Sequence, residues 1–330
     1  MTGGAGRRRW VLGADSGGSG LRVALAPVDD PGRSDTLVSG EPVRTGPAGI
    51  DAAMLLERLL PMAHALLARV GASGPQALVI GAAGMATLGD ELRAALPAAL
   101  ESEFGTSAMA FAADAVTAYA GALGQRPGAV VAAGTGMVAL GTDLSHWRRA
   151  DGWGHLLGDC GGGAWIGRAG LDAALRAHDG RVGGSAALLA RLEKSFGPPD
   201  QLPGLLYPRS DRPALLASFA PEVAACAADD PVAARVLAEA AGHIAAAAAA
   251  VCPPLGAGEC EVSLTGGLLR LGRPLLGPLT DELSRLLPHA RRVPAAGDPL
   301  TGALALAAAL ATDRLIMPRD GRMLHVTISR

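Results

Sequence analysis

The sequence predicts an α/β fold made of two related domains, each built around a mainly parallel sheet. Runs of buried-strand character alternate with helical patterns along the chain, a succession typical of a sheet with helices on both faces. In addition, the pattern strand, glycine-rich turn, strand occurs twice, at residues 10–28 and again from residue 128. This weak internal repeat indicates two domains of common design, with a boundary near residues 118–127.

The composition is that of a globular protein without a nucleic-acid partner. The chain has 330 residues, of which 49% are hydrophobic and only 3% aromatic, so the cores are expected to consist of Ala, Val and Leu. The net charge of -2 and the scattered arginines argue against DNA or RNA binding. The first apolar run stops at Gly13, too short for a signal peptide, and the most apolar later runs fall short of the roughly 20 residues of a membrane span. A soluble cytoplasmic protein without a membrane partner is expected.

The first glycine turn differs from two familiar nucleotide-binding motifs. Residues 21–28 after the turn continue as a strand, whereas the Rossmann turn leads into a helix. A Walker P-loop requires a lysine after glycine, but the single lysine, Lys194, follows Glu193. Any phosphate must therefore be bound mostly by backbone amides and a metal ion.

The rest of the first domain reads as alternating helices and strands. Because ligands of open α/β sheets gather at the carboxyl ends of the strands, we note that Asp15, Gly84 and Asp114 all fall at such ends. The predicted elements are a helix with apolar residues from Ile50 to Leu66 and a kink at Pro61, a strand at 77–84, a helix over about 91–104, a strand at 109–113 and a helix from 115 to about 123.

The second domain starts with the repeated strand, turn, strand pattern and continues with an alanine-rich helical region. The four cysteines lack C-x-x-C spacing and are expected to be reduced, mostly buried thiols. The tail after Asp313 gives no signal. The predicted elements are a loop at 145–163, a helix from about 164, helices over 185–252 broken near Pro198, Pro213, Pro221 and Pro231, a strand at 260–265, a helix over 275–287, a short strand at 292–293 and a helix from 298 to about 310.

Three glycine motifs and one longer loop carry a resemblance to a known family. Residues 15–19, 134–136 and 264–267 resemble the phosphate-1, phosphate-2 and adenosine motifs of the superfamily of sugar kinases, actin and heat-shock ATPases. The loop Gly-Trp-Gly-His-Leu-Leu-Gly-Asp at 152–159, followed by Ala-Trp-Ile-Gly, closely resembles the N-acetylglucosamine kinase group, which is related to the benzoyl-CoA reductase activator ATPases. The similarity extends from about residue 11 to 312.

The resemblance implies two actin-like ATPase domains of the ribonuclease H-like type with a cleft between them, in a homodimer. The implied organisation is an N-terminal domain over 1–118, a C-terminal domain with a helical insertion over 119–297, a helix at 298–312 that packs back on the N-terminal domain, and a tail at 313–330. The implied activity is ATP-dependent transfer of the γ-phosphate to the 6-hydroxyl of N-acetyl-D-glucosamine or a close relative, with Mg²⁺ as cofactor.

The resemblance also implies roles for individual residues, because phosphoryl transfer needs alignment and charge neutralisation. Asp114 is the implied catalytic base and also contacts the sugar. Asp15 is the implied organiser of Mg²⁺, through water. The remaining implied contacts are those of Gly17, Gly18, Ser19, Gly134, Thr135 and Gly136 with the phosphates, of Gly266 and Gly267 with adenosine, and of Gly152, Trp153, Gly154 and Asp159 with the sugar.

Several alternatives stay open from the sequence. Asp114 could cap the helix that follows it, and Asp159 could merely order the glycine loop. Trp153 and Trp165 could be packing residues, His155 could be structural, and Cys160 could be an inert replacement for the glutamate common in the family. Because the chain contains no asparagine, the side-chain amides with which the family contacts the sugar are missing. Alternative functions are a kinase of glucosamine or another hexosamine, a redox-activator ATPase whose dimer shares an iron-sulfur cluster, and a non-catalytic sugar sensor.

Overall fold

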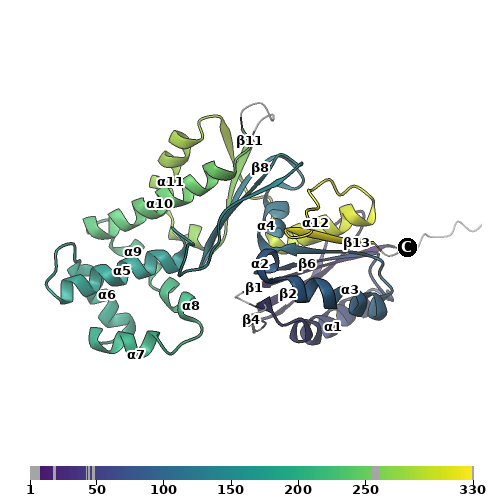
Figure 1. The fold of residues 1–330 in the computed structure, drawn as a ribbon, viewed down its shortest axis with the longest axis horizontal. Helices are drawn as coiled ribbons and strands as arrows, with labels where there is room; N and C mark the ends of the chain where they lie inside the picture. Colours follow the sequence, from purple (N-terminus) through teal and green to yellow (C-terminus); the bar gives the residue numbers. More distant parts are fainter. Residues whose placement is uncertain are drawn as a thin grey trace, which may run out of the picture. The chain divides into compact units, whose positions relative to one another are not determined.

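The computed structural model describes residues 8–328, except for 18–19, 42, 44, 47–48 and 255–259. The chain forms two compact units, each built around its own sheet (Figure 1). Unit 1 comprises Met1–Pro127, Thr142–Trp147 and Pro294–Arg330, and unit 2 comprises Gly128–Gly141 and Arg148–Val293. The predicted α/β fold class is confirmed.

The sheet of unit 1 has three parallel strands at its centre. β1 (Trp10–Gly17) pairs in parallel with β6 (Ala77–Ala82), and β6 pairs in parallel with β7 (Ala108–Ala113). Antiparallel strands complete the order β13-β7-β6-β1-β2-β3. They are β2 (Gly20–Pro27), β3 (Asp35–Ser39) and β13 (Leu324–Ile328). The sequence reading did not anticipate β3 or β13, nor the two-residue strands β4 (Thr45–Gly46) and β5 (Gly49–Ile50).

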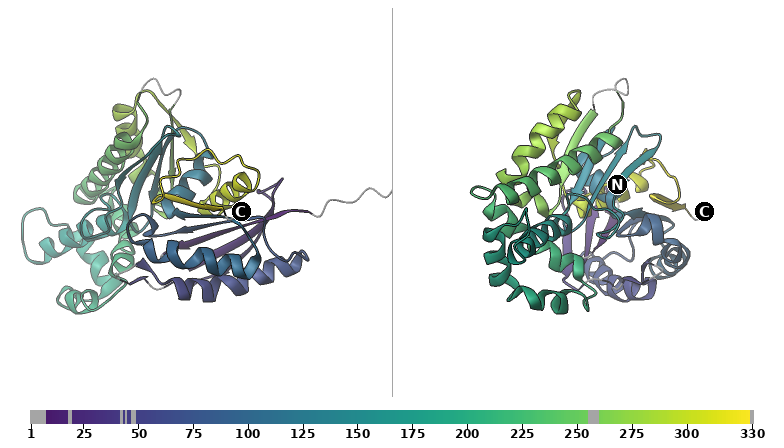
Figure 2. Two further views of the ribbon diagram at one scale, coloured as in Figure 1. Left: turned by 45° about the vertical axis from the view of Figure 1, so that its right-hand side comes forward. Right: turned by 60° about the vertical axis from the view of Figure 1, so that its left-hand side comes forward.

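Helices cover both faces of this sheet, as Figure 2 shows in its left view. α1 (Ala52–Arg69) and α3 (Asp90–Phe104) lie on one face, and α4 (Asp114–Leu123) and α12 (Pro299–Ala311) on the other. The short α2 (Met85–Leu88) follows β6. α1 begins where the side chain of Asp51 accepts a hydrogen bond from the N–H of Met54, a capping contact that satisfies an otherwise unpaired donor. α1 continues through Pro61, where the sequence predicts a kink.

α4 and α12 cross at glycines, which brings their backbones unusually close. A Cβ atom added to Gly302 would lie 2.0 Å from the carbonyl oxygen of Thr117, and one added to Gly121 would lie 2.1 Å from that of Asp298. Any side chain at these two positions would push the helices apart. The crossing therefore fixes the start of α12 against the helix that begins at Asp114.

The sheet of unit 2 has the order β10-β9-β8-β11-β12. β8 and β11 pair in parallel with Leu264 opposite Val131, so the two strands end side by side. β10 lies inside the segment predicted to be a loop. The strands are β8 (Gly128–Ala133), β9 (Met137–Thr142), β10 (Trp147–Asp151), β11 (Cys260–Thr265) and β12 (Ala290–Pro294).

Prolines separate the helices of unit 2, as the sequence predicted. Pro213, Pro221 and Pro231 each stand in the first turn of a helix, where the missing N–H leaves no intrahelical bond unmade. The helices are α5 (Gly163–His178), α6 (Ala186–Phe196), η1 (Pro199–Gln201), α7 (Leu202–Leu206), α8 (Arg212–Ala217), α9 (Ala220–Cys226), α10 (Pro231–Val251), η2 (Gly267–Leu271) and α11 (Arg273–Leu286).

One of these helices, α10, is more apolar than the sequence reading suggested. Its 21 residues include an 18-residue window of mean hydropathy 1.3, which by length and composition alone would suit a membrane span. Half of that window is buried within the protein, and its inward residues, such as Leu237 and Ile244, belong to the core of unit 2. A buried core helix can have the same length and hydropathy as a membrane span, so these two properties of α10 are weak evidence for a membrane.

Two cysteines are paired, contrary to the prediction of reduced thiols. Cys252 at the end of α10 and Cys260 at the start of β11 form a disulfide, with Cα atoms 7.0 Å apart. The prediction was wrong for this pair because it relied on sequence spacing, whereas the return of the chain from α10 into β11 brings the two residues together. Cys160 and Cys226 are free.

Candidate active site

The two carboxylates predicted in unit 1 lie at one edge of its sheet. Asp15 is opposite Gly81 in the register of β1 and β6, and Gly81 is opposite Ala112 in that of β6 and β7. Asp114 follows β7 directly. The carboxyl ends of these parallel strands share an edge, and β1 and β7 are two strand spacings apart, about 10 Å. The structure thus brings Asp15 and Asp114 to the same edge of unit 1.

Asp15 is paired with an arginine that the sequence reading missed. Nε and Nη2 of Arg22 donate to Oδ2 of Asp15, at 3.2 and 2.6 Å. The third nitrogen, Nη1, donates to Oδ2 of Asp298 at the start of α12. A signal was available in the sequence, because residues 15 and 22 face each other across a predicted hairpin, where opposite charges attract. Asp298, 276 residues away from Arg22, gave no such signal.

Asp114 is the first residue of α4 and is partly buried. Its Oδ1 accepts a hydrogen bond from the N–H of Ala115 at 2.9 Å, and its carbonyl oxygen accepts one from Thr117 Oγ1 at 2.9 Å. A carboxylate in the first turn is also stabilised by the helix dipole. Asp114 is therefore not the N-cap that the sequence left open beside catalysis, because α4 begins at Asp114 itself and its N-cap residue is Ala113.

The phosphate-1 turn is described only in part, since Gly18 and Ser19 lie outside the described residues. A Cβ added to Gly17 would have no atom within 4 Å. Next to Gly17, Ser16 is fully buried, and its Oγ has no hydrogen-bond partner among the residues that the structure describes. The turn thus combines open space at its glycine with a buried hydroxyl.

The phosphate-2 turn of unit 2 rests on the beginning of α5. The N–H of Gly163 donates to the carbonyl oxygen of Gly134, and that of Ala164 donates to that of Thr135, both at 2.8 Å. Within the turn, the N–H of Gly134 donates to the carbonyl oxygen of Gly136 at 2.9 Å. These bonds fix the turn between β8 and β9.

The adenosine turn lies beside the phosphate-2 turn because β11 runs next to β8. Gly266 has a φ of 106°, and a Cβ there would lie 2.1 Å from the carbonyl oxygen of Ala133. Both the backbone angle and the close approach require glycine. A Cβ on the neighbouring Gly267 would meet no atom within 4 Å. Unit 2 therefore brings together two of the predicted nucleotide-binding turns.

The loop predicted to bind sugar is held by a carboxylate at the end of β10. Oδ1 of Asp151 accepts the N–H of Asp159 at 2.6 Å, and its Oδ2 accepts the N–H of Cys160 at 2.9 Å. Oδ1 of Asp159 accepts the N–H of Gly154 at 3.0 Å and so closes the loop. Asp151 and Asp159 have φ values of 59° and 54°, a conformation that aspartate tolerates better than most residues. Sequence reasoning did not single out Asp151.

The carboxylate of Asp159 lies directly on the phosphate-2 turn. A Cβ added to Gly136 would be 2.3 Å from Oδ2 of Asp159, so glycine is needed for this contact. Burial raises the pKa of Asp159 above its ordinary value, although the hydrogen bond from Gly154 opposes the shift. The carboxylate that the sequence predicts to bind sugar and the turn that it predicts to bind phosphate thus lie against each other within unit 2.

The aromatic residues of this region differ in their surroundings. Trp153 is 62% exposed, and the guanidinium of Arg149 lies 4.7 Å from the centre of its ring. Trp165 packs edge-on against His243 inside unit 2, which supports a packing role. Burial raises the pKa of the Cys160 thiol, so a reactive thiolate is disfavoured.

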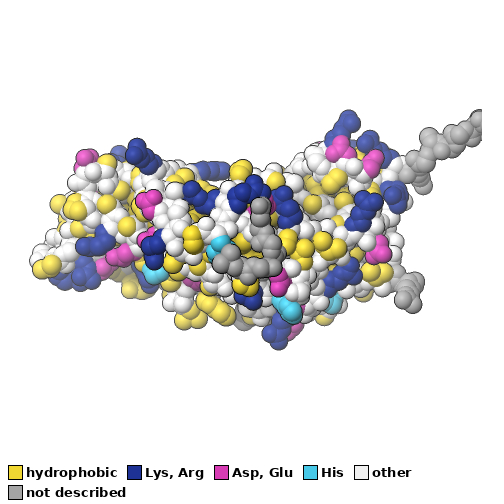
Figure 3. All heavy atoms as spheres, turned by 90° about the horizontal axis from the view of Figure 1, so that it is seen from above, with side chains coloured by type: hydrophobic (Ala, Val, Ile, Leu, Met, Phe, Trp, Pro, Cys, Tyr) yellow, Lys and Arg dark blue, Asp and Glu magenta, His cyan; other side chains and the backbone are white. Residues whose placement is uncertain are grey.

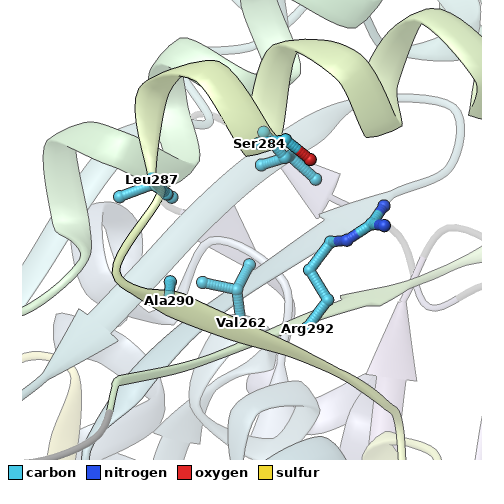
Figure 4. Close-up of a pocket in the computed structure, with 6 residues that line it drawn as sticks. Val262, Ser284, Leu287, Ala290 and Arg292 are labelled. Atoms are coloured by element: carbon cyan, nitrogen blue, oxygen red, sulfur yellow. The ribbon is translucent and has the colours of Figure 1, made fainter.

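A small cavity elsewhere in unit 2 has no connection with the predicted residues. It lies between α11 and the strands β11 and β12, and Figure 4 shows Arg292 and Ser284 at its margin. Its volume of about 30 Å³ leaves room for a few water molecules at most.

On the face that Figure 3 shows, basic and acidic side chains are interspersed with apolar and other groups.

The residues present fit a magnesium ion that is held by few protein ligands and mainly by the phosphates of a bound nucleotide. Both hydrogen bonds that Asp15 accepts from Arg22 end on Oδ2, and a carboxylate oxygen is a ligand that Mg²⁺ prefers. Among the described residues no group of three His, Cys, Asp or Glu side chains could form a metal cage. Mg²⁺ in kinases usually relies on one or two carboxylates, water and the phosphates of its substrate.

Comparison with known proteins places the chain in a family. Residues 12–307 match the BadF/BadG/BcrA/BcrD ATPase family, and the chain belongs to it. A 179-residue stretch is 28% identical to the N-acetylmuramic acid/N-acetylglucosamine kinase of Clostridium acetobutylicum, covering 52% of this chain and 56% of that relative, little more than half its length.

Solved structures support the fold. A Chromobacterium violaceum protein, proposed to be an N-acetylglucosamine kinase, is 27% identical with a TM-score of 0.71, over 92% of this chain and 99% of that one. A ROK family glucokinase from Streptomyces griseus, in complex with glucose and AMPPNP, is 19% identical with a TM-score of 0.56, over 92% and 99% of the two chains. The second likeness concerns the fold alone.

Proposed function

We propose that this protein is an ATP-dependent amino-sugar kinase that phosphorylates the 6-hydroxyl of N-acetyl-D-glucosamine or a close relative. The observation that carries the proposal is the contact of Asp159 with Gly136, which joins a loop of the type that binds polar substrates to a glycine turn of the type that binds phosphates. The likeness to the Clostridium acetobutylicum and Chromobacterium violaceum proteins supports the same substrate class.

In the proposed reaction, Asp114 accepts the proton of the sugar hydroxyl. A primary hydroxyl does not ionise near neutral pH, so a positioned base must take its proton as the bond to the γ-phosphorus forms. The open glycines Gly17 and Gly134 let phosphate oxygens approach backbone N–H groups. Asp15 would hold Mg²⁺ through water, and the ion supplies charge neutralisation to the triphosphate when bound.

Sugar recognition in this proposal depends on carboxylate and backbone groups. Asp159 offers Oδ2, whereas Oδ1 is used by Gly154, and the chain has no asparagine to contact an N-acetyl group. We therefore propose a modest preference for N-acetylglucosamine over glucosamine, below the 10⁴ to 10⁵ that a dedicated hydrogen-bonding site reaches. The kcat/KM ratio of the two sugars measures it.

The test is an ADP-release assay with a panel of hexoses and hexosamines, combined with Asp114→Asn. The Asn variant cannot accept the proton but keeps the size and an oxygen for the N–H of Ala115. We expect turnover to fall by roughly 10² to 10⁴, with ADP affinity kept. Asp90→Asn is the matched control, because Asp90 also stands in the first turn of a unit 1 helix but is fully exposed, and its activity should be that of the wild type.

Two outcomes would contradict the proposal. If Asp114→Asn, shown by thermal melting to be folded, keeps more than about a tenth of the turnover, Asp114 is not the base. If no sugar stimulates ADP release and the anaerobically purified protein contains stoichiometric iron and sulfide, the activator alternative replaces the kinase.

A further inference from the structure

The cluster Asp15, Arg22 and Asp298 distributes the hydrogen bonds of one guanidinium unevenly. Arg22 directs two nitrogens to a single oxygen of Asp15, Oδ2, and the third to Asp298. Oδ1 of Asp15 accepts none of the bonds that these three side chains make. A rigid fork that holds one carboxylate oxygen fixes the plane of the carboxylate and thereby the direction of the other oxygen.

Asp298 is itself fixed, so that it can hold Arg22 in turn. Its Oδ1 accepts the N–H of Thr301 at 2.9 Å and the Oγ1 of Thr301 at 2.8 Å, which caps α12. The backbone of Asp298 lies against Gly121 of α4, where no Cβ would fit. Arg22 is therefore attached to a rigid helix start on one side and to Asp15 on the other.

Arg22 also lowers the negative charge that Asp15 and Asp298 would present to a phosphate group. Two carboxylates at a phosphate-binding edge would repel a polyphosphate, and the phosphate-1 turn has no lysine, since the single lysine of the chain is Lys194 in α6 of unit 2. Arg22 reduces the net charge of the cluster to one negative unit. Its side chain is 32% exposed, and partly exposed ion pairs add little to folding stability. A role in the site explains the cluster better than a role in folding.

We propose that Arg22 is a positioning residue that orients Asp15 toward the metal ion of the bound nucleotide, and that Asp298 anchors Arg22. This inference rests on the proposed function, because it assumes that unit 1 binds a magnesium nucleotide. Arg22 acts through Asp15, so its loss affects the affinity for the metal-nucleotide complex and spares the affinity for the nucleotide alone.

The experiment is calorimetric titration of the full-length protein with ADP, once with Mg²⁺ and once with EDTA. Loss of a residue that orients a metal ligand typically costs 10- to 100-fold in metal affinity. We expect Arg22→Gln to weaken binding of the magnesium complex by about that factor while changing the affinity for metal-free ADP less than about twofold. Asp298→Asn, which keeps an oxygen for Thr301, should weaken the magnesium complex in the same direction.

Two further variants separate orientation from charge and from folding. Arg22→Lys keeps the charge without the fork, and it should stay closer to the Gln variant than to the wild type. Arg69→Gln removes the arginine of another unit 1 ion pair, 2.7 Å from Asp35 and half-exposed, and should bind like the wild type. Thermal melting checks that each variant folds.

The outcomes are distinguishable. If Arg22→Gln weakens metal-free ADP as much as the magnesium complex, Arg22 contacts phosphate directly and the inference is overturned. If Arg22→Gln leaves the affinities for metal-free ADP and for the magnesium complex unchanged, or if Arg22→Lys binds the magnesium complex as tightly as the wild type, orientation of Asp15 by the guanidinium is refuted. The proposed function then still stands. If the wild type binds no magnesium nucleotide at all, the proposed function itself fails.

Discussion

Asp151 offers the sharpest test of how the loop over residues 151–160 is held. Its two oxygens each accept one backbone N–H, from Asp159 and from Cys160. A Cβ added to Gly158 would lie only 2.3 Å from Oδ1 of Asp151, so the loop packs closely around this carboxylate. Asp151→Asn keeps one acceptor oxygen and replaces the other by an NH₂ group, which cannot accept. One backbone N–H then faces a donor, and the charge that strengthens the second bond is lost.

The expected magnitude follows from these two bonds. A hydrogen bond to a charged group is worth about 1.5–3 kcal/mol, and the partial exposure of the loop reduces the loss to about 2 kcal/mol. For a unit of this size, that corresponds to a melting temperature lower by about 4–8 °C. Because Asp159 moves with its backbone, the proposed function also predicts that the KM for sugar rises more than the Kd for ADP.

The control is Asp143→Asn, a matched change in an exposed turn. Asp143 also accepts two backbone N–H groups, from Ser145 and His146, but both are accepted by the same oxygen, Oδ1, as is the hydroxyl of Ser145. Asn keeps one such acceptor oxygen, so in this exposed turn we expect the change to cost less than about 0.5 kcal/mol. Melting curves of the two variants are compared under the same conditions. If Asp151→Asn melts within about 1 °C of Asp143→Asn, the two hydrogen bonds that Asp151 accepts do not hold the loop, and the reasoning fails.

Two further predictions concern stability. The raised pKa of Asp159 means that the folded state holds this proton more tightly than the unfolded state, so its contribution to stability is present below the usual pKa of about 3.9 and is lost as the pH rises through the raised value. Asp159→Asn should therefore melt at a higher temperature than the wild type near neutral pH, with the difference vanishing in acid; equal melting at both pH values would contradict the shift. Gly302→Ala should destabilise the protein by about 1–3 kcal/mol, because its Cβ would lie 2.0 Å from the carbonyl oxygen of Thr117. Gly242→Ala in α10 is the control: its Cβ would meet no atom within 4 Å, and the change should stabilise the protein by about 0.5–1 kcal/mol. Chemical denaturation of both variants measures the two effects, and a Gly302→Ala protein as stable as the wild type would show that the helix crossing can relax.

Much of the fold could be predicted from sequence because the relevant signals are local. Alternation and helical periodicity are properties of neighbouring residues, which is why the central strands and the main helices were located to within a few residues. Glycine turns are local as well, since a positive φ or a close backbone approach restricts the residue itself, as at Gly266. The placement of Asp15 and Asp114 at one edge also followed from sequence, because parallel strands end on the same side of their sheet.

The remaining features depend on residues that meet only after folding. β13 has no pattern strong enough to identify it, and it becomes a strand because the edge of β7 offers unpaired backbone groups. Cys252 and Cys260 were misjudged for the same reason, and the contact of Asp159 with Gly136 has no signature in either segment.

The sequence by itself thus determined the order of the central strands and main helices, the glycine turns and the positions of Asp15, Asp114 and Asp159. Tertiary structure decided which side chains those carboxylates contact. Arg22 shows the physical reason: its partner Asp15 is within reach along the hairpin, but Asp298 is 276 residues away, and only the packing of α12 against α4 brings that second carboxylate to the same guanidinium.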